Sequence, residues 1–501
     1  MKNANIIINK HFISGEIDKR IYSSFVEHMG RVIYSGIYEP GHPTADEDGF
    51  RQDVIEKVKE MGVTGIRYPG GNFVSCYDWR DGVGPIKQRP NRLELAWRSI
   101  ETNEFGTNEF MRWAKKVDIE PIFALNLGTK GIENAISFVE YCNIAGGTLY
   151  SDLRKEHGVL EPYGIKTWCL GNEMDGKWQI GHKTAEEYGR LAQETAKAIK
   201  LIDPDIKLIA CGSSKSDMDT YPEWEAVTLK HTYEYVDYIA LHQYYGGQNQ
   251  GTGEFLAQAL DMEQYIRTVI SVCDYIKAEK RSSKELYISL DEWGVWAIPD
   301  NEVTKEIDRT PWRLAPGFSE QIYSMEDTLL FADMLMVILK YAGRVKIACQ
   351  SLLTNISAAI MTEKNGDVWV QPIYYPFAYM SKYGRGVVMQ SIVGSPVYQC
   401  EQFEEVPYVD TVTVYNKERE ELVYFQINRR EQNVGISSEI QGFRPEHIIE
   451  HVALWAEDKK MTNRTEHDAI RPEQLEDVEL YEDGFKYIME PLSWNMIRVK
   501  V

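Results

Sequence analysis

Short apolar runs rich in β-forming residues alternate with amphipathic segments along most of the chain, and this alternation predicts strands that are each followed by a helix. Eight such units predict an α/β fold closed into a (β/α)8 barrel, because parallel strands need helical crossovers between them. An open doubly wound sheet is the alternative, but no glycine-rich dinucleotide-binding turn follows any of the runs. The runs that we expect to form barrel strands are residues 21–26, 65–68, 121–125, 165–170, 207–210, 238–241, 286–290 and 346–350.

Three amphipathic segments give clear helix signals. Residues 50–61 repeat apolar residues at helical spacing and stop at Gly62, a common residue just past a helix end. Residues 184–202 open with Thr184 and Glu187, which form a capping-box pair, and they end before Pro204. Residues 325–339 are a longer apolar run, which we expect to be a helix packed against the barrel.

The hydrophobic pattern changes after about residue 383. The rest of the chain consists of short alternating segments separated by charged turns, which is typical of an antiparallel β-sandwich. We therefore expect a barrel at residues 16–383 and a β-sandwich at residues 384–501. An apolar run at residues 4–10 precedes the barrel, so residues 1–15 are expected to add a strand to the sandwich.

Charge and composition narrow the possible partners. The chain has 55 Lys and Arg against 76 Asp and Glu, a formal net charge of −21, which argues against nucleic acids and anionic membranes. No stretch approaches the roughly 20 apolar residues of a membrane span, and no signal peptide is recognised, so we expect a cytoplasmic protein. The seven cysteines contain no CxxC pair, so neither zinc nor a disulfide framework is expected. The 12 Trp and 30 Tyr suit sugar faces, or else subunit interfaces.

Two glutamates follow predicted strands where a barrel concentrates its chemistry. Glu173 comes directly after Asn172 at the end of the fourth predicted strand, and Glu292 follows the seventh. Strand ends converge on one barrel mouth, so the two carboxyl groups can meet there. Hydrolysis of a glycosidic bond needs one carboxyl group to protonate the departing oxygen and another to attack the anomeric carbon or activate water. Ordinary ion pairs at the rim are the alternative, but two such glutamates, each with a Trp nearby, favour catalysis.

Other residues at predicted strand ends are candidate ligands. Asn172 can bind a sugar hydroxyl next to the reacting carbon, Arg67 can keep a carboxylate ionised, and Tyr244 can donate a hydrogen bond to it. His242 is a further candidate ligand, and a purely structural role is its alternative. The ten histidines show no metal-ligand spacing, so they do not indicate a metal site. The further candidates are Glu27 and Asn72 as polar contacts and Trp97, Trp178 and Trp296 as sugar platforms, each of which has ordinary rim packing as its alternative.

The chain resembles the α-L-arabinofuranosidases of glycoside hydrolase family 51 in an ordered set of motifs from about residue 20 to about residue 380. These motifs are Glu27-His28-Met29-Gly30-Arg31, Gly36-Ile37-Tyr38-Glu39-Pro40-Gly41-His42-Pro43, Arg67-Tyr68-Pro69-Gly70-Gly71-Asn72-Phe73, Thr102-Asn103-Glu104-Phe105-Gly106-Thr107, Trp168-Cys169-Leu170-Gly171-Asn172-Glu173-Met174-Asp175-Gly176 and Asp291-Glu292-Trp293-Gly294-Val295-Trp296. Each motif alone is moderately specific, whereas the ordered set is strong.

The resemblance implies a barrel with a jelly-roll domain and a double displacement that retains the anomeric configuration, without a metal or an organic cofactor. It implies that Glu173 is the acid/base, Glu292 the nucleophile and Tyr244 the hydrogen-bond partner of the nucleophile. It assigns Glu27, Asn72 and Asn172 to the arabinofuranose hydroxyls and Trp296 to a wall of the sugar pocket. It also implies a cytoplasmic homohexamer that acts on oligosaccharides from arabinan or arabinoxylan.

The sequence departs from the family pattern on the last barrel strand. The family usually carries Gln three positions before the residue aligned with Asn355, where this chain has Leu352, and Cys349 stands where Asn is frequent. Alternate residues share a strand face, so Gln350 is a candidate for the missing sugar contact. A hydrogen bond lost to a buried hydroxyl costs about 1–3 kcal/mol. Lys177 replaces a frequent Pro near the leaving-group side.

The sequence leaves three alternatives to an α-L-arabinofuranosidase, which are a glycosidase for another sugar, a carbohydrate-binding barrel and a Schiff-base enzyme. The same machinery could serve another sugar, as in a β-xylosidase or an endoglucanase, and aryl glycosides would separate these. A non-catalytic carbohydrate-binding barrel is disfavoured because both strand-end glutamates are present with Asn172 and Tyr244. A Schiff-base enzyme needs a lysine at a strand end, whereas Lys166 and Lys346 lie at predicted strand starts. If the enzyme is retaining, the two carboxyl groups should lie about 5–5.5 Å apart.

Overall fold

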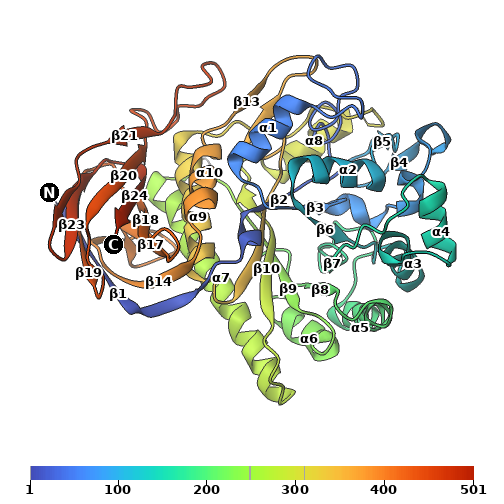
Figure 1. Cartoon of the computed structure of the whole chain (residues 1–501), viewed down its shortest axis with the longest axis horizontal. Coiled ribbons are helices and arrows are strands. Elements are labelled where there is room, and N and C mark those ends of the chain that lie inside the picture. The colour runs from blue at the N-terminus through green and yellow to red at the C-terminus, as the bar shows by residue number, and fades with distance from the viewer. Residues whose placement is uncertain (1, 248–249, 310) are drawn as a thin grey trace.

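The computed structural model describes residues 2–247, 250–309 and 311–501, and its larger part is the expected closed parallel barrel (Figure 1). Each expected strand is present, and consecutive barrel strands pair in parallel. The fold class predicted from the alternation of strands and helices is therefore confirmed. The barrel strands are β2 (Ser23–Phe25), β3 (Gly65–Tyr68), β6 (Glu120–Ala124), β7 (Thr167–Leu170), β8 (Lys207–Cys211), β9 (Tyr238–Tyr245), β10 (Tyr287–Val295) and β11 (Val345–Gln350).

Two barrel strands run further than the sequence indicated. The strand β9 continues four residues past position 241, and β10 continues five residues past position 290. Their pairing shifts register between Ser289 and Glu292, where β10 gains one residue on β9. Such a bulge re-aims side chains at a barrel rim. Glu292 consequently lies within β10 and not after it.

Helices surround the barrel, and their ends follow the local signals in the sequence. Gly62 adopts a left-handed conformation with φ of 75° and caps α1, while Thr184 and Glu187 form the expected capping box of α5. The helices are α1 (Gln52–Met61), α2 (Thr107–Val117), α3 (Ile132–Asn143), α4 (Leu149–Glu156), α5 (Ala185–Ile202), α6 (Glu223–Thr232), α7 (Thr252–Glu279), α8 (Asp300–Arg309), α9 (Met325–Lys340) and α10 (Tyr374–Tyr383). Among the described residues, no helix is both long and apolar enough to cross a membrane.

The second part of the molecule is a ten-stranded sheet that contains both ends of the chain (Figure 1). Its order is β21-β20-β24-β18-β17-β14-β1-β19-β23-β22, so β1 lies between β14, to which it is antiparallel, and β19, to which it is parallel. The bounds are β1 (Lys2–Glu16), β14 (Val387–Gly394), β17 (Val409–Asn416), β18 (Glu421–Asn428), β19 (Val434–Gln441), β20 (His447–Leu454), β21 (Glu473–Leu475), β22 (Glu479–Tyr481), β23 (Gly484–Met489) and β24 (Ser493–Lys500). Small two-stranded sheets are formed by β4 (Arg92–Glu94) with β5 (Ser99–Glu101), β12 (Ile360–Thr362) with β13 (Val368–Val370), and β15 (Val397–Tyr398) with β16 (Val406–Pro407).

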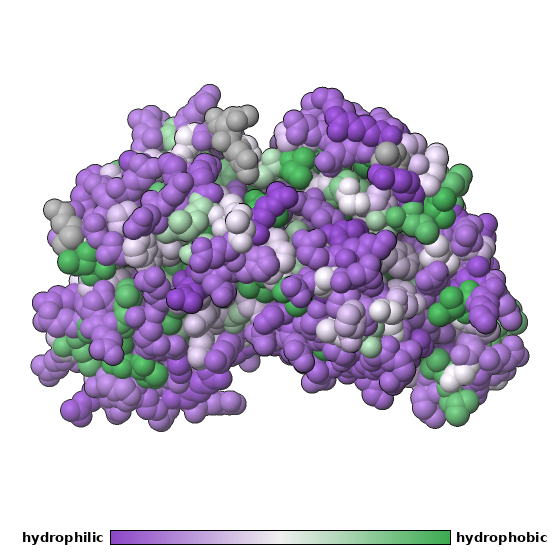
Figure 2. All heavy atoms as spheres, turned by 90° about the horizontal axis from the view of Figure 1, so that it is seen from above, coloured by the Kyte–Doolittle hydropathy of each residue, from purple (hydrophilic) through white to green (hydrophobic). Residues whose placement is uncertain are grey.

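The strand β18 shows how this sheet is held on both faces. Val423, Phe425 and Ile427 join the large core that includes the barrel and α9, while the alternate residues Leu422 and Tyr424 join a second core. The second core also contains apolar residues of β1, β19 and β23, so the sheet folds over itself. Outside these cores the surface is largely hydrophilic, and the face in Figure 2 shows apolar side chains only in small separate groups.

A buried ion cluster joins the sheet to the barrel. Arg429, which follows β18, donates from Nε to Asp333 of α9 at 2.8 Å and from Nη2 to Asp410 of β17 at 3.0 Å. Lys340 at the end of α9 also contacts Asp410. The side chains of Arg429 and Asp333 are almost fully buried. Because removal of one partner leaves an uncompensated buried charge, such a cluster is costly to break.

We therefore expect Arg429→Met to lower the thermal unfolding midpoint strongly, with a loss of about 3–5 kcal/mol in the free energy of unfolding, because Asp333 would stay buried without its cation. Differential scanning calorimetry would measure this change. The control is Lys57→Met, which removes an exposed partner of Glu60 on α1 and should change the free energy by less than about 0.5 kcal/mol. An unchanged midpoint for Arg429→Met would contradict the assigned role.

Candidate active site

The carboxyl groups of Glu173 and Glu292 meet at the mouth of the barrel. Glu173 follows β7, the fourth barrel strand, and Glu292 lies on β10, the seventh. One oxygen of each and a ring nitrogen of His242 all lie within 4.8 Å of one another. Glu173 has a φ of 46°, a left-handed conformation that is uncommon for a residue with a side chain. Such strain is often found at functional sites, where the surroundings hold the residue in place.

Arg67 of β3 binds three residues of this cluster. Its Nη1 donates to Oε1 of Glu292 at 2.6 Å, and its Nη2 donates to Oδ1 of Asn172 at 2.6 Å. Its Nε lies 3.1 Å from Oδ2 of Asp291. All these side chains are buried. The planar guanidinium thus fixes Glu292 relative to two different strands.

His242 of β9 lies among three carboxylates. Its Nδ1 is 3.0 Å from Oε1 of Glu173 and 3.5 Å from Oε2 of Glu292, and its Nε2 is 3.4 Å from Oδ1 of Asp291. Burial by itself would lower the pKa of the imidazole, but Glu292, Asp291 and Glu173 together raise this pKa to about 10. The ring is therefore a cation at neutral pH, and its two N–H groups point to Glu173 and to Asp291.

Tyr244 connects the nucleophile candidate to the last barrel strand. Its hydroxyl lies 2.8 Å from Oε2 of Glu292, to which it donates, and 2.7 Å from Oγ of Ser351. Trp296 packs its ring edge-on against Tyr244, with 5.8 Å between the ring centroids. Both oxygens of Glu292 therefore have donors on buried or partly buried side chains.

Two of the candidate hydroxyl ligands, Asn72 and Asn172, are joined to one another by a hydrogen bond and to the cluster through Arg67. Asn172 donates from Nδ2 to Oδ1 of Asn72 at 3.3 Å, and the amide of Gln179 donates to the same oxygen. Glu27 accepts from the backbone N–H of Phe73 at 3.2 Å. Burial and the nearby Glu292 raise the pKa of Glu27 well above its usual range.

A glycine is required beside Glu27. Gly70 has a φ of 129°, and a Cβ built on it would lie 2.0 Å from Cβ of Glu27. The Gly70-Gly71 pair in the loop after β3 therefore lets the backbone pass close enough for Phe73 to donate to Glu27.

The three candidate tryptophans occupy different places. Trp178 donates from Nε1 to Oε2 of Glu173 at 2.6 Å, and its side chain is 48% exposed. Trp296 contacts Tyr244 as described above. Trp97 lies in the hairpin between β4 and β5, where its ring packs against Phe318 at 6.1 Å, and no described contact joins it to the carboxylates.

Gln350 lies at the end of β11 with its side chain fully buried. Its Nε2 donates to the carbonyl of Ser357 at 3.0 Å, and its Oε1 lies 3.4 Å from the hydroxyl of Ser24. Leu352 is also buried. The Gln350 amide thus contacts Ser357 and Ser24 within the protein, and its expected contact with the sugar stays a prediction.

Three residues of the cluster were not singled out from the sequence. Neighbouring strand residues normally face opposite ways, so the strand pattern does not predict that Asp291 joins Glu292, whereas the bulge in β10 lets both contact the same Arg67. Gln179 and Ser351 come from loops whose folding no short-range pattern indicates. Only the position of Ser351, directly after a strand, is a usable signal.

Glu173, His242 and Glu292 could in principle offer oxygen and nitrogen ligands to a metal ion. A histidine ligand must be neutral, because a protonated ring nitrogen has no free lone pair. The raised pKa of His242 opposes that requirement at neutral pH. The arrangement thus suits acid–base and nucleophilic chemistry better than metal binding, and the expectation of no cofactor stays a prediction.

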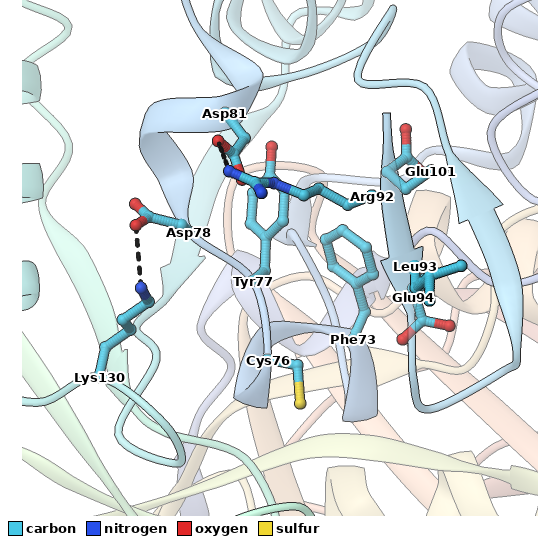
Figure 3. A pocket seen from close by; sticks show the side chains of 10 residues that line it. All are labelled: Phe73, Cys76, Tyr77, Asp78, Asp81, Arg92, Leu93, Glu94, Glu101 and Lys130. Carbon is cyan, nitrogen blue, oxygen red and sulfur yellow. Dashed lines mark hydrogen bonds and ion pairs between the residues drawn. The ribbon is translucent and has the colours of Figure 1, made fainter. Parts of the chain in front are cut away.

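A separate pocket of about 270 Å³ (Figure 3) has Phe73 in its wall, and Phe73 also contacts Glu27 of the cluster. Phe73 connects the two, because its ring lines the pocket while its N–H donates to Glu27. The wall carries paired charges, with Asp78 3.1 Å from Lys130 and Asp81 2.8 Å from Arg92. Neither Glu173 nor Glu292 lines this pocket, so the pocket is separate from the carboxylate cluster.

Comparison with known proteins gives a consistent result. Residues 57–267 match the model of the alpha-L-arabinofuranosidase 1 domain, and residues 291–493 match that of the alpha-L-arabinofuranosidase C-terminal domain. The chain is 51% identical to an intracellular exo-α-(1→5)-L-arabinofuranosidase of Acetivibrio thermocellus over 100% of both chains, and 52% identical to one of Bacillus subtilis over 100% of this chain and 99% of the relative.

Solved structures agree with these relatives. A family 51 α-L-arabinofuranosidase from Bifidobacterium longum matches over 100% of both chains with a TM-score of 0.94 and 37% identity. An arabinose complex of the α-L-arabinofuranosidase from Thermotoga maritima matches over 100% of both chains with a TM-score of 0.88 and 32% identity.

The charge on His242 predicts a specific pH dependence of stability. Its pKa is about 10 in the folded chain and 6.5 as an ordinary group, so protonation stabilises the fold fully below about pH 6.5, and this contribution is lost as the pH rises through 10. Between pH 7 and pH 10 we therefore expect the thermal midpoint to fall more steeply in the wild type than in His242→Gln. The exposed His11 supplies a control, since His11→Gln should follow the wild type. Parallel curves for the wild type and His242→Gln would refute the charged state.

Proposed function

The chain belongs to the α-L-arabinofuranosidases of glycoside hydrolase family 51, and we propose that Glu173 is its acid/base and Glu292 its nucleophile. The observation that carries this assignment is the approach of two carboxyl oxygens to within 4.8 Å at the barrel mouth. Inverting glycosidases hold their carboxyl groups about 6.5–9.5 Å apart to admit a water molecule, whereas retaining ones hold them about 5–5.5 Å apart. The short separation supports direct attack by Glu292.

The reaction proceeds in two displacements. In the first, the Glu292 carboxylate attacks the anomeric carbon, the bond from that carbon to the leaving oxygen breaks, and Glu173 gives its proton to that oxygen. The product is an arabinosyl ester on Glu292. In the second, Glu173 takes a proton from water, the water oxygen attacks the same carbon, and the ester bond to Glu292 breaks. Two inversions restore the starting configuration.

The remaining cluster binds and orients the sugar in this proposal. Glu27, Asn72 and Asn172 face the site as hydroxyl ligands, and Trp296 closes one wall of it. Tyr244 and Arg67 hold the two oxygens of Glu292 so that attack needs no reorientation. Hydrogen bonds that tighten as charge develops at the anomeric carbon lower the barrier.

The substrate is a terminal non-reducing α-L-arabinofuranosyl residue on an oligosaccharide from arabinan or arabinoxylan. The relatives from Acetivibrio thermocellus and Bacillus subtilis are named for (1→5) linkages and as intracellular, which supports (1→5) cleavage in the cytoplasm. A Bifidobacterium longum relative, 44% identical over 86% of this chain, is named for (1→6) linkages. Arabinobioses of both linkages should therefore be assayed side by side.

A β-xylosidase or endoglucanase activity is not favoured. A bifunctional glucanase-xylanase with a TM-score of 0.60 is only 12% identical to the chain, so it shares the fold alone. The carbohydrate-binding alternative is not favoured either, because both glutamates lie in a buried, charged cluster of the kind that catalysis requires.

The proposed assembly is a homo-oligomer, with the hexamer implied by the family resemblance. Apolar side chains on β1 and β14 support an interface, because Phe12, Ile13 and Ile392 are each more than half exposed. Light scattering of the full chain should give six times 57.8 kDa. Ile392→Asp should reduce that mass, while Leu201→Asp, at a still more exposed position on α5, should not. A monomer mass for the wild type would overturn the assembly.

The roles of the two glutamates can be tested with 4-nitrophenyl α-L-arabinofuranoside. Glu292→Ala should lose on the order of 10⁴-fold in kcat, and added azide should restore turnover by taking the place of the nucleophile, with a β-configured azide as the product. Glu173→Ala should instead release the activated phenol and give the α-configured azide, since Glu292 still acts first.

The control for this pair is Glu133→Ala on the outer face of α3, which should keep wild-type activity. Exchanged azide configurations would reverse the two roles. A wild type that does not cleave the substrate would instead contradict the proposed sugar.

A further inference from the structure

The two oxygens of Glu173 have different hydrogen-bond donors. Oε1 lies 3.0 Å from Nδ1 of His242, on the buried side of the cluster. Oε2 accepts from the indole N–H of Trp178 at 2.6 Å, and that indole is about half exposed. Oε1 is thus held from within the barrel, and Oε2 is held from the solvent side.

The turn after Glu173 is built to place the indole there. The backbone N–H of Gly176 donates to the carbonyl of Glu173 at 2.9 Å, which closes the turn. A Cβ built on Gly176 would lie 2.5 Å from the indole of Trp178. Glycine at position 176 therefore leaves the space in which the ring folds back over Glu173. The ammonium group of Lys215 lies 5.9 Å from the centroid of the indole ring.

This contact conflicts with proton donation. A leaving-group oxygen must come within about 2.6–3.2 Å of the carboxyl oxygen that protonates it. Oε1 faces His242, so Oε2 is the oxygen that remains for a substrate arriving from solvent. In the free chain the indole N–H of Trp178 occupies the position beside Oε2. An indole N–H only donates, so it stabilises the carboxylate and cannot accept its proton.

We propose that Trp178 is a positioning residue for Glu173, whose indole N–H holds Oε2 in the free enzyme and gives up that place to the leaving-group oxygen. The proposal rests on the assignment of Glu173 as the acid/base. Half exposure lets the ring move outward without disturbing the core, and the same N–H returns to the carboxylate once the proton has left.

Besides the indole of Trp178, several charged or titratable groups surround Glu173. They are His242 and Tyr244 from β9, Glu292 from β10, and Asp175 from the same turn, whose carboxylate accepts from the backbone N–H of Ser214 at 3.0 Å. Trp178→Phe deletes the indole N–H and leaves all of these residues in the chain. A donor to a carboxylate favours its charged form, so deletion makes the acid form persist to higher pH.

The test is the pH dependence of kcat/KM for 4-nitrophenyl α-L-arabinofuranoside and for a (1→5)-linked arabinobiose. Trp178→Phe keeps a ring and removes the N–H, and it should move the alkaline limb upward by about one pH unit. Gly176→Ala keeps Trp178 but displaces the indole, and it should move the limb in the same direction. Trp369→Phe, in the hairpin of β12 and β13, is the matched control and should keep the wild-type profile.

The outcomes separate the possible explanations. A higher KM with an unmoved limb in both variants would overturn the proposal and leave Trp178 as a sugar platform. A limb that moves to lower pH would also overturn it. If Glu173→Ala keeps the wild-type alkaline limb, the acid/base assignment itself fails, whatever the tryptophan variants show.

Discussion

The site depends on the buried guanidinium of Arg67. Arg67 lies on β3 and binds Asn172, which follows β7. It also binds Asp291 and Glu292 on β10, so one cation connects three strands of the barrel at the carboxylate cluster. A buried cation without partners would be very costly, and so would the carboxylates without it. The packing of these three strands and the geometry of the candidate site thus depend on the same contacts of Arg67.

His242 completes the balance of charge that Arg67 begins. The two cations face three buried carboxylates, and each carboxylate contacts at least one cation. Asp291 lies 3.1 Å from Nε of Arg67 and 3.4 Å from Nε2 of His242, and it accepts from the thiol of Cys169 at 3.5 Å. Burial would raise its pKa, but Arg67 and His242 hold this pKa below its usual range. Asp291 thus stays charged and orients Arg67 and His242, which in turn orient Glu292 and Glu173.

The sequence predicts the regular strands and helices, whose residues repeat at a fixed spacing, but it does not predict the bulge and the paths of the loops. The eight barrel strands, the capped ends of α1 and α5 and the two glutamates follow from hydrophobic period, capping residues and the convergence of strand ends. The bulge in β10 has no such signature, so the sequence does not predict that Asp291 joins the cluster beside Glu292. The contact of Ser351 with Tyr244 and that of Trp178 with Glu173 depend on the path of loops. For Gln350, strand alternation indicated a face but could not show that Ser357 and Ser24 engage its amide.

The surroundings of the two glutamates differ in a way that fits two different tasks. Glu292 has its oxygens held by Arg67 and by Tyr244, both anchored on barrel strands, so it is fixed in place and receives donors that favour a carboxylate. A nucleophile needs such a fixed charge. Glu173 follows its strand in a left-handed conformation, and one of its oxygens has a half-exposed partner. A group that must give up a proton and later recover it needs one oxygen with access to the substrate and to water. The barrel thus supplies one rigid carboxyl group and one accessible carboxyl group from the same buried cluster, and this asymmetry supports the roles proposed for the two glutamates.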